Sequence, residues 1–296
     1  MKFIWFKGDL GNQVFSCAFY NYLKKKFPHE KIYGCMKTSV PIVVNKYFDL
    51  ELPESYKYLD NLLFVIFRIS KKLHIKWGMS TDVYFKEDAL FYNGYWQNNK
   101  FYDRDNSWLK MKLPKDIGSK NLAILEDMKK TNSVSIHIRR GDYLKYKKIY
   151  GIDTDTYYKN AIVKIKQIIE NPVFFYFSND MEWVRENMGD KNRDYYIDWN
   201  VGERSFLDMY LMSKAKANII ANSTFSYWAA YLNENNAIVI YPKEWYNKNC
   251  TEKSPAETTV AAQVQLIDEA ITQGCKSISI STNGDTGFDE VFAKAQ

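Results

Sequence analysis

The chain has 296 residues, of which 46% are hydrophobic and 17% aromatic, and it carries a net charge of +6. This length suits one large domain or two of ordinary size. The apolar content is enough to build a sizeable core, so intrinsic disorder is not the default expectation. The mildly basic balance fits an anionic ligand, a nucleic acid or an acidic membrane surface and does not choose among them.

The cysteines and the apolar segments bear on the compartment. Four cysteines lie far apart with no Cys-x-x-Cys spacing, which predicts reduced thiols and neither a disulfide framework nor a zinc site. The longest strongly apolar run, Leu62 to Phe67, is too short to cross a bilayer. The N-terminus reads directly as a strand, without the regions of a secretion signal. We therefore expect a cytoplasmic protein.

The N-terminal part begins with a strand over residues 3–6, a glycine loop over residues 8–11 and a helix over residues 13–26. The loop fails as a dinucleotide fingerprint because its spacing is not Gly-x-Gly-x-x-Gly and because Asp9 would repel a pyrophosphate. A tight turn is the simpler interpretation. Residues 37–115, which are rich in Tyr, Trp and Asn, are expected to be irregular.

One stretch inside this irregular region, residues 62–77, mixes large apolar with basic side chains. The pattern favours a half-buried core helix with a solvated basic end. The alternative is a helix that lies on an anionic surface, which would make the protein peripheral at the inner membrane surface.

Strands and helices alternate from residue 120 to residue 242. Strands are expected at residues 134–138, 173–177, 195–197, 218–221 and 237–241. Helices are expected at residues 120–130, 156–170, 180–187, 203–215 and 223–232. This alternation predicts a parallel sheet covered on both faces. With the N-terminal elements it predicts an α/β fold of two Rossmann-like domains facing across a cleft, residues 1–118 and 119–255.

A change of composition separates residues 256–296 from the rest. This tail holds six acidic and two basic residues, so its net charge is −4 while residues 1–255 carry +10. Its pattern predicts a helix, a strand over residues 277–281 and a last helix. The stretch Gln265-Leu266-Ile267-Asp268-Glu269-Ala270-Ile271, followed by Gln273-Gly274-Cys275, resembles a fragment of a periplasmic sugar-binding protein. A frameshift, fusion or assembly artefact is one interpretation, and a packed C-terminal extension is the other.

The segment His137-Ile138-Arg139-Arg140-Gly141-Asp142-Tyr143 carries the clearest chemical signal. Ser135, His137 and Arg139 share the polar face of the strand, which emerges at its carboxyl end, where α/β sheets place their ligands. Adjacent arginines grip the oxygens of an anion, and glycine lets backbone approach closely. The segment predicts an anion site, and a surface basic pair capped by Asp142 is the alternative.

A second signal, Asn222-Ser223-Thr224-Phe225, lies between an apolar strand and a helix. Small hydroxyl side chains and free backbone N–H groups at a helix N-terminus form a phosphate site. Ordinary N-capping by Asn222 or Ser223 is the alternative, and the two roles are compatible.

Two triplets, Asp103-Arg104-Asp105 and Asp153-Thr154-Asp155, have the spacing of metal ligands for a sugar nucleotide. The first lies in a polar loop, and the second stands at the start of a helix, where capping residues belong. We therefore expect no metal site.

Seven blocks of sequence, in this order, resemble the bacterial α-1,2-fucosyltransferases of glycosyltransferase family 11. The blocks are Gly8-x-Leu10-Gly11-Asn12-Gln13-x-Phe15, Gly94-Tyr95-Trp96-Gln97, His137-x-Arg139-Arg140-Gly141-Asp142-Tyr143, Tyr157-Tyr158-x-x-Ala161-Ile162, Phe177-Ser178-Asn179-Asp180, Asp208-Met209-x-Leu211-Met212-Ser213 and Ala221-Asn222-Ser223-Thr224-Phe225-Ser226-x-Trp228-Ala229-Ala230. Two features depart from the family: Asp9 stands where a second glycine is usual, and the tail replaces the usual C-terminal end.

The resemblance implies a GT-B fold in which the C-terminal half holds the donor, GDP-fucose. The N-terminal half would hold the acceptor, a galactose-terminated oligosaccharide. The implied reaction is inverting transfer of L-fucose to the galactose 2-hydroxyl, for surface glycan synthesis, with no metal and no other cofactor.

The resemblance also implies a donor site. Its expected residues are His137, Gly141, Asp208, Asn222, Ser223, Thr224, Phe225, Asn12 and Gln13. His137 and Asp208 are expected to meet the guanine region, and Arg139 the β-phosphate. The segment from Ser223 to Phe225 is expected to close over the pyrophosphate.

Three residues are expected to act in catalysis. Arg139 and Arg140 would stabilise the negative charge that builds on departing GDP, because without a metal that charge falls to guanidinium groups and helix N–H dipoles. Inversion favours a base at the acceptor hydroxyl, and Asp142 is the nearest carboxylate in sequence. The stronger alternative is that Asp142 orients Arg139 or Arg140 through a salt bridge. Since a strongly dissociative transition state needs little help from a base, a further interpretation is that no base exists.

Three other functions compete with this one. A GDP-fucose enzyme of another linkage, such as α-1,6, would share the same phosphate-binding residues. An RNA-binding protein would need aromatic and basic side chains interleaved on one exposed sheet. Here the arginines follow a buried strand, so no nucleic-acid partner is expected. A non-catalytic glycan-binding module would have no need of paired arginines.

Overall fold

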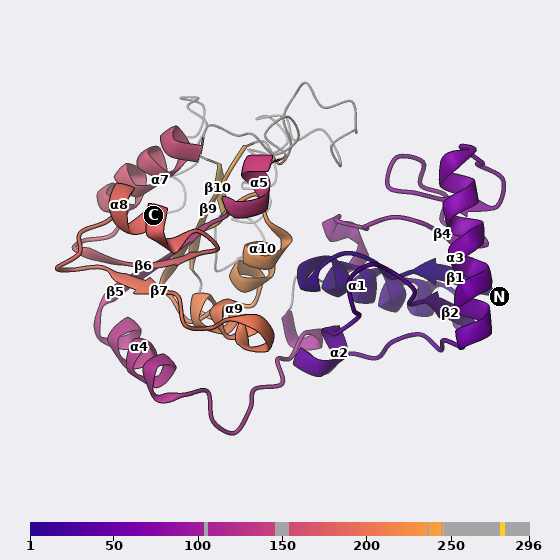
Figure 1. The fold of residues 1–296 in the computed structure, drawn as a ribbon, viewed down its shortest axis with the longest axis horizontal. Coiled ribbons are helices and arrows are strands. Elements are labelled where there is room, and N and C mark those ends of the chain that lie inside the picture. Colours follow the sequence, from indigo (N-terminus) through magenta and orange to yellow (C-terminus); the bar gives the residue numbers. More distant parts are fainter. Residues whose placement is uncertain (104–105, 146–153, 236, 244, 246–278, 282–296) are drawn as a thin grey trace. The chain divides into compact units, whose positions relative to one another are not determined.

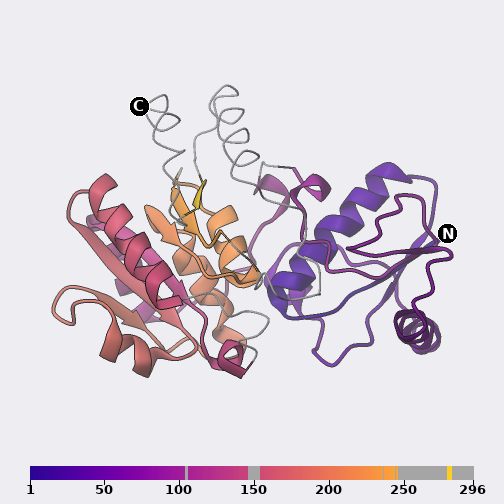
Figure 2. The same cartoon turned by 90° about the horizontal axis from the view of Figure 1, so that it is seen from above.

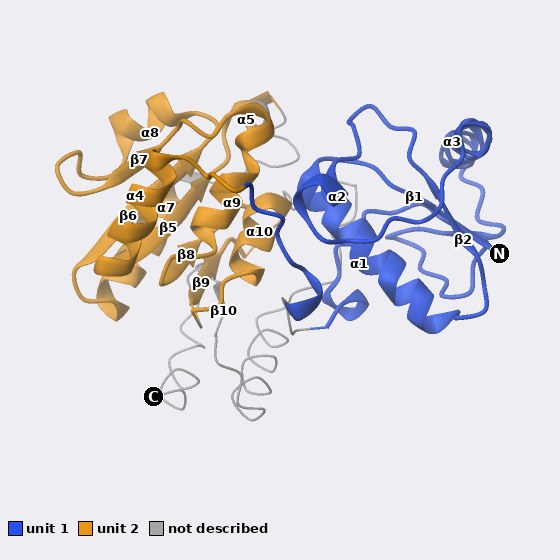
Figure 3. Cartoon of the chain, turned by 90° about the horizontal axis from the view of Figure 1, so that it is seen from below, with its two compact units in different colours: residues 1–114 blue, residues 115–296 orange. Residues whose placement is uncertain are grey.

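The computed structural model of the chain describes residues 1–103, 106–145, 154–235, 237–243, 245 and 279–281. The chain divides into two compact units, residues 1–114 and 115–296 (Figure 3). The sequence places this division after residue 118, and it sets residues 256–296 apart. Both helices expected in the tail lie outside the described residues.

Unit 1 is built on a four-stranded parallel sheet (Figure 1). The strands β1 (Lys2–Trp5), β2 (Ile32–Cys35), β3 (Met79–Ser80) and β4 (Phe91–Tyr92) lie in the order β2-β1-β4-β3. The helical segments are α1 (Leu10–Lys26), α2 (Val44–Tyr47), α3 (Lys57–Lys72), η1 (Asn99–Phe101) and η2 (Asn106–Trp108). The expectation that residues 37–115 are irregular is therefore wrong. Strands of two residues are too short to leave an alternating pattern in the sequence.

Helices α1 and α3 cover opposite faces of this sheet (Figure 2). Phe3 and Phe91 are register partners on one face, and Phe67 of α3 packs there with its ring centroid 6.0 Å from that of Phe91. Tyr92 points to the other face, where the ring of Phe19 from α1 lies 5.4 Å away. This assignment follows from the two-residue period of a strand.

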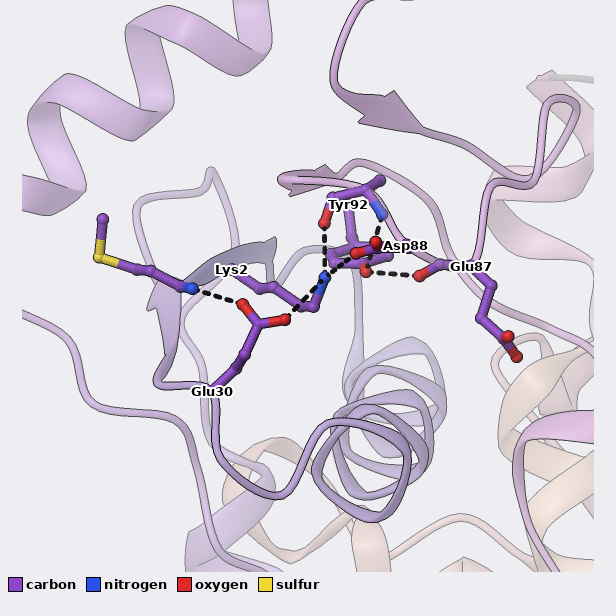
Figure 4. A network of polar contacts seen from close by, with 7 residues as sticks. Lys2, Glu30, Glu87, Asp88 and Tyr92 are labelled. Atoms are coloured by element: carbon purple, nitrogen blue, oxygen red, sulfur yellow. Dashed lines mark hydrogen bonds and ion pairs between the residues drawn. The ribbon is translucent and has the colours of Figure 1, made fainter.

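The amino end of β1 holds a buried lysine in a polar network (Figure 4). The Lys2 ammonium donates to Asp88 Oδ1 at 2.6 Å and to the carbonyl oxygen of Ala89 at 3.1 Å. It also lies 3.4 Å from Glu30 Oε1, and 3.9 Å from the ring centroid of Phe27. Because these groups compensate the buried charge, we assign Lys2 a structural role.

Unit 2 is built on a six-stranded parallel sheet. The strands β5 (Asn132–Ile138), β6 (Pro172–Ser178), β7 (Tyr195–Ile197), β8 (Ala217–Ile219), β9 (Ile238–Tyr241) and β10 (Ser279–Ser281) lie in the order β10-β9-β8-β5-β6-β7. The helical segments are α4 (Ser119–Lys130), α5 (Gly141–Lys145), α7 (Thr154–Ile168), α8 (Met181–Asn187), η3 (Gly202–Arg204), α9 (Phe206–Met212) and α10 (Thr224–Tyr231). The predicted strands are confirmed, with bounds that shift by one or two residues.

In unit 2, one predicted helix is divided in two, and one strand predicted in the tail joins the sheet. The single helix expected over residues 203–215 is divided into the 3-10 turn η3 and the shorter helix α9. The strand expected over residues 277–281 is present as β10, which pairs in parallel with β9.

Both faces of β5 are covered, as the sequence predicts. Val134, Ile136 and Ile138 belong to a buried apolar cluster with residues of α7 and β6. The opposite, polar face is buried as well. Ser135 is 1% exposed there and accepts a 2.6 Å hydrogen bond from Asn218 Nδ2, and His137 is 6% exposed.

The chain order of unit 2 creates a topological switch at β5. From β5 the sheet grows through β6 to β7, and the chain then returns to β8 on the other side of β5. The loops that leave the carboxyl ends of β5 and β8 therefore run in opposite directions, and ligands of open α/β sheets bind in the crevice between such loops.

Each half is thus a parallel α/β unit, and the α/β fold with two Rossmann-like halves is confirmed. The cleft between the halves stays a prediction. Among the helices of the described residues, we find none with the length and apolar content to cross a membrane.

Candidate functional site

The structure brings together the two segments that the sequence singled out separately. Residues 139–143 follow β5, residues 220–225 follow β8, and these strands are neighbours. The Tyr143 hydroxyl donates to the carbonyl oxygen of Asn222 at 2.9 Å, and the rings of His137 and Phe225 lie 5.7 Å apart. The segments predicted to bind an anion and a phosphate therefore lie together at the switch point of the sheet.

Arg139 is the first residue after β5 and lies half-buried at this site. Its guanidinium carbon is 5.6 Å from the ring centroid of Tyr143, a cation–π arrangement that restrains the side chain. The same tyrosine is bonded to Asn222, so Arg139 is held beside the loop that begins α10.

His137 is buried behind Arg139. Its backbone carbonyl accepts a 2.8 Å hydrogen bond from Tyr158, which fixes the end of β5 on α7. Its Nδ1 atom is buried and has no hydrogen-bond partner among the described residues. Burial, with a smaller contribution from the charge of Arg139, lowers the pKa of the imidazole to about 3. The ring is therefore neutral near pH 7. A ligand group could form the hydrogen bond that its Nδ1 atom lacks within the described part of the chain.

Arg140 points to a different part of the unit. Its Nε atom lies 3.2 Å from Asp180 Oδ2, and its guanidinium carbon lies 3.7 Å from the ring centroid of Trp183. Its backbone N–H donates to Asn179 Oδ1 at 3.0 Å. These contacts join the end of β5 to the start of α8, so the guanidinium has a structural partner that was not predicted from the sequence. Asn179 and Asp180 belong to the block Phe177-Ser178-Asn179-Asp180 at the carboxyl end of β6, which carries part of the family resemblance but does not predict this contact.

Gly141 is required by close packing inside the site. A Cβ atom at this position would lie 2.5 Å from Asn179 Nδ2, closer than side chains tolerate. Asn179, from the neighbouring loop, thus packs against Gly141, and the predicted close approach of an anion stays a prediction. Asp142 follows within α5, and its side chain lies outside the described residues, so its predicted roles as base or salt-bridge partner stay predictions.

The segment after β8 begins α10 with a capped N-terminus. Ser223 is the N-cap, and its Oγ accepts a 3.3 Å hydrogen bond from the backbone N–H of Phe225. Asn222 is buried, and its Nδ2 donates to the carbonyl oxygen of Trp245 at 2.9 Å. Thr224 and Phe225 are half-buried. The N-capping interpretation is confirmed, and phosphate binding by the remaining N–H groups stays compatible with it.

Asp208 lies in the first turn of α9, half-buried. A helix that follows a parallel strand runs antiparallel to it, so this turn belongs to the carboxyl edge of the sheet. Its Oδ1 accepts a 2.8 Å hydrogen bond from Asn200, which in turn exchanges hydrogen bonds with Asn121 of α4. Burial is the main cause that raises the pKa of Asp208 to about 7; the Asn200 hydrogen bond lowers the pKa and Asp198 raises it slightly. Asn200 and Asn121 were not predicted from the sequence.

The glycine loop of unit 1 is a tight turn that packs against the side chain of Asn12. Gly8 has φ +81°, and a Cβ atom there would lie 2.7 Å from Asn12 Nδ2. Asp9, at φ −71° and ψ 176°, is exposed in ordinary extended backbone, so the missing second glycine is tolerated. Asn12 accepts a 2.7 Å hydrogen bond from Gln97 Nε2, which ties the loop to the segment after β4.

Gln13 is fully buried inside unit 1. Its Nε2 donates to the carbonyl oxygens of Gly8 and Pro41, both at 2.9 Å. Its Oε1 accepts from the backbone N–H groups of Val43 at 2.8 Å and Val44 at 3.1 Å. This amide has no capacity left for a ligand in this conformation.

A further cluster lies at the carboxyl edge of the unit 1 sheet, beyond β1 and β4. Lys7 Nζ donates to Asn93 Oδ1 at 2.7 Å and lies 4.9 Å and 4.7 Å from the ring centroids of Trp5 and Tyr95. Burial lowers the pKa of this lysine to about 8, against a smaller opposing effect of Asp82. Lys7 was not predicted from the sequence, although Tyr95 of this cluster belongs to the block Gly94-Tyr95-Trp96-Gln97.

No group of three or more side chains that could hold a metal ion occurs among the described residues. Asp103, from one of the two Asp-x-Asp triplets, pairs with Lys25 at 2.9 Å. Residues 104, 105 and 153 of those triplets lie outside the described part of the chain.

The chain matches the model of a known protein family, Glycosyl transferase family 11, over residues 5–260. A match of this extent shows the family, so this chain belongs to glycosyltransferase family 11, as the seven blocks predicted. It covers most of the chain and ends just inside the tail.

Three relatives have similar sequences. An α-1,2-colitosyltransferase of Escherichia coli is 37% identical over 161 residues, which cover 52% of this chain and 56% of the relative. The E. coli O-antigen biosynthesis glycosyltransferase WbnK is 32% identical over 215 residues, 71% of this chain and 69% of the relative. A galactoside α-(1,2)-fucosyltransferase 1 of Leontocebus fuscicollis is 35% identical over 105 residues, 33% of this chain and 28% of the relative. The matched region thus spans about half of the first relative and less than a third of the last.

Two solved structures are distantly similar in fold. NodZ α-1,6-fucosyltransferase soaked with GDP-fucose matches with a TM-score of 0.47 at 14% identity, over 78% of this chain and 92% of its own. The E. coli ADP-heptose LPS heptosyltransferase II matches with a TM-score of 0.39 at 10% identity, over 82% of this chain and 86% of its own. Likenesses this weak carry no conclusion about the reaction.

Proposed function

We propose that this chain transfers L-fucose from GDP-β-L-fucose to the 2-hydroxyl of a terminal galactoside, with inversion and without a metal ion. The observation that carries the proposal is the position of Tyr143. Its ring lies beside the guanidinium of Arg139, and its hydroxyl is bonded to Asn222 at the start of α10. A fixed cation and a helix N-terminus thus lie at one site, which suits a diphosphate.

The chemistry needs this pairing because negative charge builds on GDP as the fucosyl bond breaks. Arg139 would meet the β-phosphate, and the first N–H groups of α10 would add their dipoles. Both are held in place before reaction by the contacts of Tyr143 and by the Ser223 cap, so little reorganisation is needed as the charge develops.

Two further groups would meet the neutral part of the donor nucleotide. His137 is uncharged and offers a buried ring nitrogen, which suits a hydrogen bond and avoids repulsion beside Arg139. Asp208, with a pKa of about 7, is partly protonated near neutral pH, so its carboxyl group either donates or accepts a hydrogen bond. We propose both for recognition of the guanine region.

The acceptor would be bound by unit 1, with Lys7, Asn93, Trp5 and Tyr95 as its contacts. Aromatic rings stack on the apolar faces of sugars, and the lysine and amide provide hydrogen bonds to hydroxyl groups. The cluster lies beside a second topological switch, because β4 joins β1 on the side opposite β2.

The names of the relatives support the α-1,2 linkage and suggest two candidates for the transferred sugar, fucose and colitose. Two of them are named for α-1,2 transfer, one of colitose and one of fucose to a galactoside. The colitosyltransferase is the more extensive match of these two, so transfer of a colitosyl group is the second candidate function.

The deciding measurement is transfer from GDP-fucose to lactose, with the product linkage determined by NMR and a colitosyl donor run in parallel. An α-1,2-fucosyl product in the presence of excess chelator would support the whole proposal. An α-1,6 product would overturn the linkage, and activity restored only by Mn²⁺ or Mg²⁺ would overturn the metal-free mechanism. Glycan binding without GDP binding would favour a glycan-binding protein, whereas GDP binding without turnover of either donor would point to a different acceptor.

A further inference from the structure

One helix of unit 1, α3, carries a second apolar face whose side chains are exposed in the described part of the chain. We call this face the α3 stripe; it consists of Tyr58, Leu62, Val65, Ile69 and Leu73, followed by Ile75 and Trp77. Their exposed fractions run from 43% to 89%, and Trp77 stands at 84%. The first five recur at intervals of three or four residues, so they lie along one side of the helix.

The stripe is distinct from the side of α3 that packs on its own sheet. Leu63 and Phe67 are buried on that side, where they join the cluster around Phe3 and Met79. The expectation of a half-buried core helix is therefore met by the inner face alone. A large exposed apolar surface of this kind marks a contact with another molecule or a membrane.

The charges beside the stripe are almost all positive. Residues 57–77 contain five basic side chains and one acidic side chain, a net charge of +4 with His74 neutral. The basic residues are Lys57, Arg68, Lys71, Lys72 and Lys76, and each of them is exposed. The single carboxylate, Asp60, is turned toward its own unit, where it accepts hydrogen bonds from the Met36 backbone N–H and from Ser55.

We propose that the α3 stripe docks this protein on the surface of a membrane rich in anionic phospholipids. Helix α3 would lie in the plane of the interface, with the stripe among the acyl chains and the basic residues at the phosphate groups. Trp77, just beyond the helix, has an amphipathic ring of the kind that favours the headgroup level of a membrane. A second copy of the chain would bring two faces of charge +4 together, so charge complementarity favours lipid.

The test is sedimentation of the full chain with vesicles of phosphatidylcholine containing about one quarter phosphatidylglycerol, at roughly physiological salt. The variant Leu62→Gln/Val65→Gln/Ile69→Gln removes the three apolar side chains at the centre of the stripe and keeps residues that favour a helix. The matched control is Leu122→Gln/Val163→Gln/Ile168→Gln. It removes the same three residue types from exposed positions on α4 and α7, with exposures of 43% to 57% against 47% to 58% in the stripe. Circular dichroism checks the fold of both.

We expect the native chain and the control to bind, and the stripe variant to lose about tenfold or more in partitioning. Lys71→Gln/Lys72→Gln should weaken binding about fivefold per charge, and added salt should do the same to the native chain. Equal binding by stripe variant and control would overturn the proposal, as would absence of binding to anionic vesicles. It would also be overturned if the stripe variant changed only the oligomeric state, because the face would then join two copies. None of these outcomes depends on the identity of the transferred sugar.

Discussion

The hydroxyl of Tyr143 donates a 2.9 Å hydrogen bond to the backbone carbonyl of Asn222, and this bond joins the loops that leave β5 and β8. These loops run apart in the chain and meet only because the two strands are neighbours. The ring of the same tyrosine lies beside Arg139, so one side chain sets the position of the cation relative to the helix N-terminus. The proposed donor site depends on this relationship.

Tyr143→Phe removes the bond and keeps the ring. We expect a loss of about 1 kcal/mol in stability and a clear rise in the GDP dissociation constant, because the two halves of the anion site lose their link. Tyr196→Phe is the matched control, since its hydroxyl donates a 2.9 Å bond to the Met188 carbonyl away from the site. It should cost similar stability and leave GDP binding intact, as measured by calorimetry and thermal unfolding. Equal GDP affinity in both variants would contradict the role of Tyr143.

The two adjacent arginines should behave differently when each is replaced by alanine. Arg139→Ala should lower kcat by about 10²–10³ with little change in stability, because its charge acts on the departing GDP. Arg140→Ala should mainly lower stability, by about 1–2 kcal/mol, because it breaks the contacts with Asp180 and Trp183.

A double-mutant cycle separates the two arginines further. Arg140 and Asp180 should show a coupling energy in unfolding, whereas Arg139 and Asp180 should show none. If Arg140→Ala abolished transfer at unchanged stability, the guanidinium of Arg140 would act on the donor directly, as expected from the sequence.

Asp208 should give the protein a stability that falls as pH rises. Its folded pKa of about 7 lies above the ordinary value of 3.8, so between these values the folded state holds a proton that the unfolded state has lost. Folding is therefore favoured at low pH, and this contribution disappears as pH rises to about 7. Asp208→Asn should flatten the slope between about pH 4 and pH 7 in thermal or urea unfolding. A slope identical to that of the native chain would show that this carboxyl titrates normally.

Much of unit 2 and less of unit 1 could be predicted from the sequence, for a physical reason. Strands such as β5 and β6 have seven residues each and leave an apolar pattern between helices. The two-residue strands β3 and β4 leave none. They form because neighbouring strands and the aromatic residues of α1 and α3 hold them, which is tertiary information.

The candidate site shows the same limit. Each half could be predicted locally, because paired arginines after a buried strand and small polar residues before a helix have direct chemical meanings. Their meeting requires β8 to lie beside β5, whereas the chain visits β6 and β7 in between. For the same reason the partner of Arg140, forty residues away at Asp180, could not be predicted.

Gly8 should be intolerant of substitution for two separable reasons. Gly8→Ala meets both the strain of φ +81° and a clash at 2.7 Å with Asn12 Nδ2, whose side chain is bonded to Gln97. Gly202→Ala is the control, because Gly202 has φ +58° and a Cβ atom added there would meet nothing within 4 Å. We expect about 1 kcal/mol of destabilisation for the control and clearly more for Gly8→Ala in urea unfolding. Equal destabilisation by the two variants would mean that the loop around Gly8 shifts to relieve the clash with Asn12 at no cost in stability.

Lys7 provides a test of the acceptor side that leaves the donor side untouched. Lys7→Met keeps the length of the side chain and removes its charge and its hydrogen bond to Asn93. We expect the KM for lactose to rise several-fold while GDP affinity stays unchanged. In the native chain the KM for lactose should also rise above about pH 8, where the ammonium loses its proton, and the variant should lack this dependence. Lys100→Met is the control, because Lys100 likewise lies over two rings, those of Phe85 and Phe101, at a different place in unit 1. An identical rise of the lactose KM in the Lys100 variant would mean that any aromatic-bound lysine of this unit has the same effect, and the Lys7 cluster would then have no special part in acceptor binding.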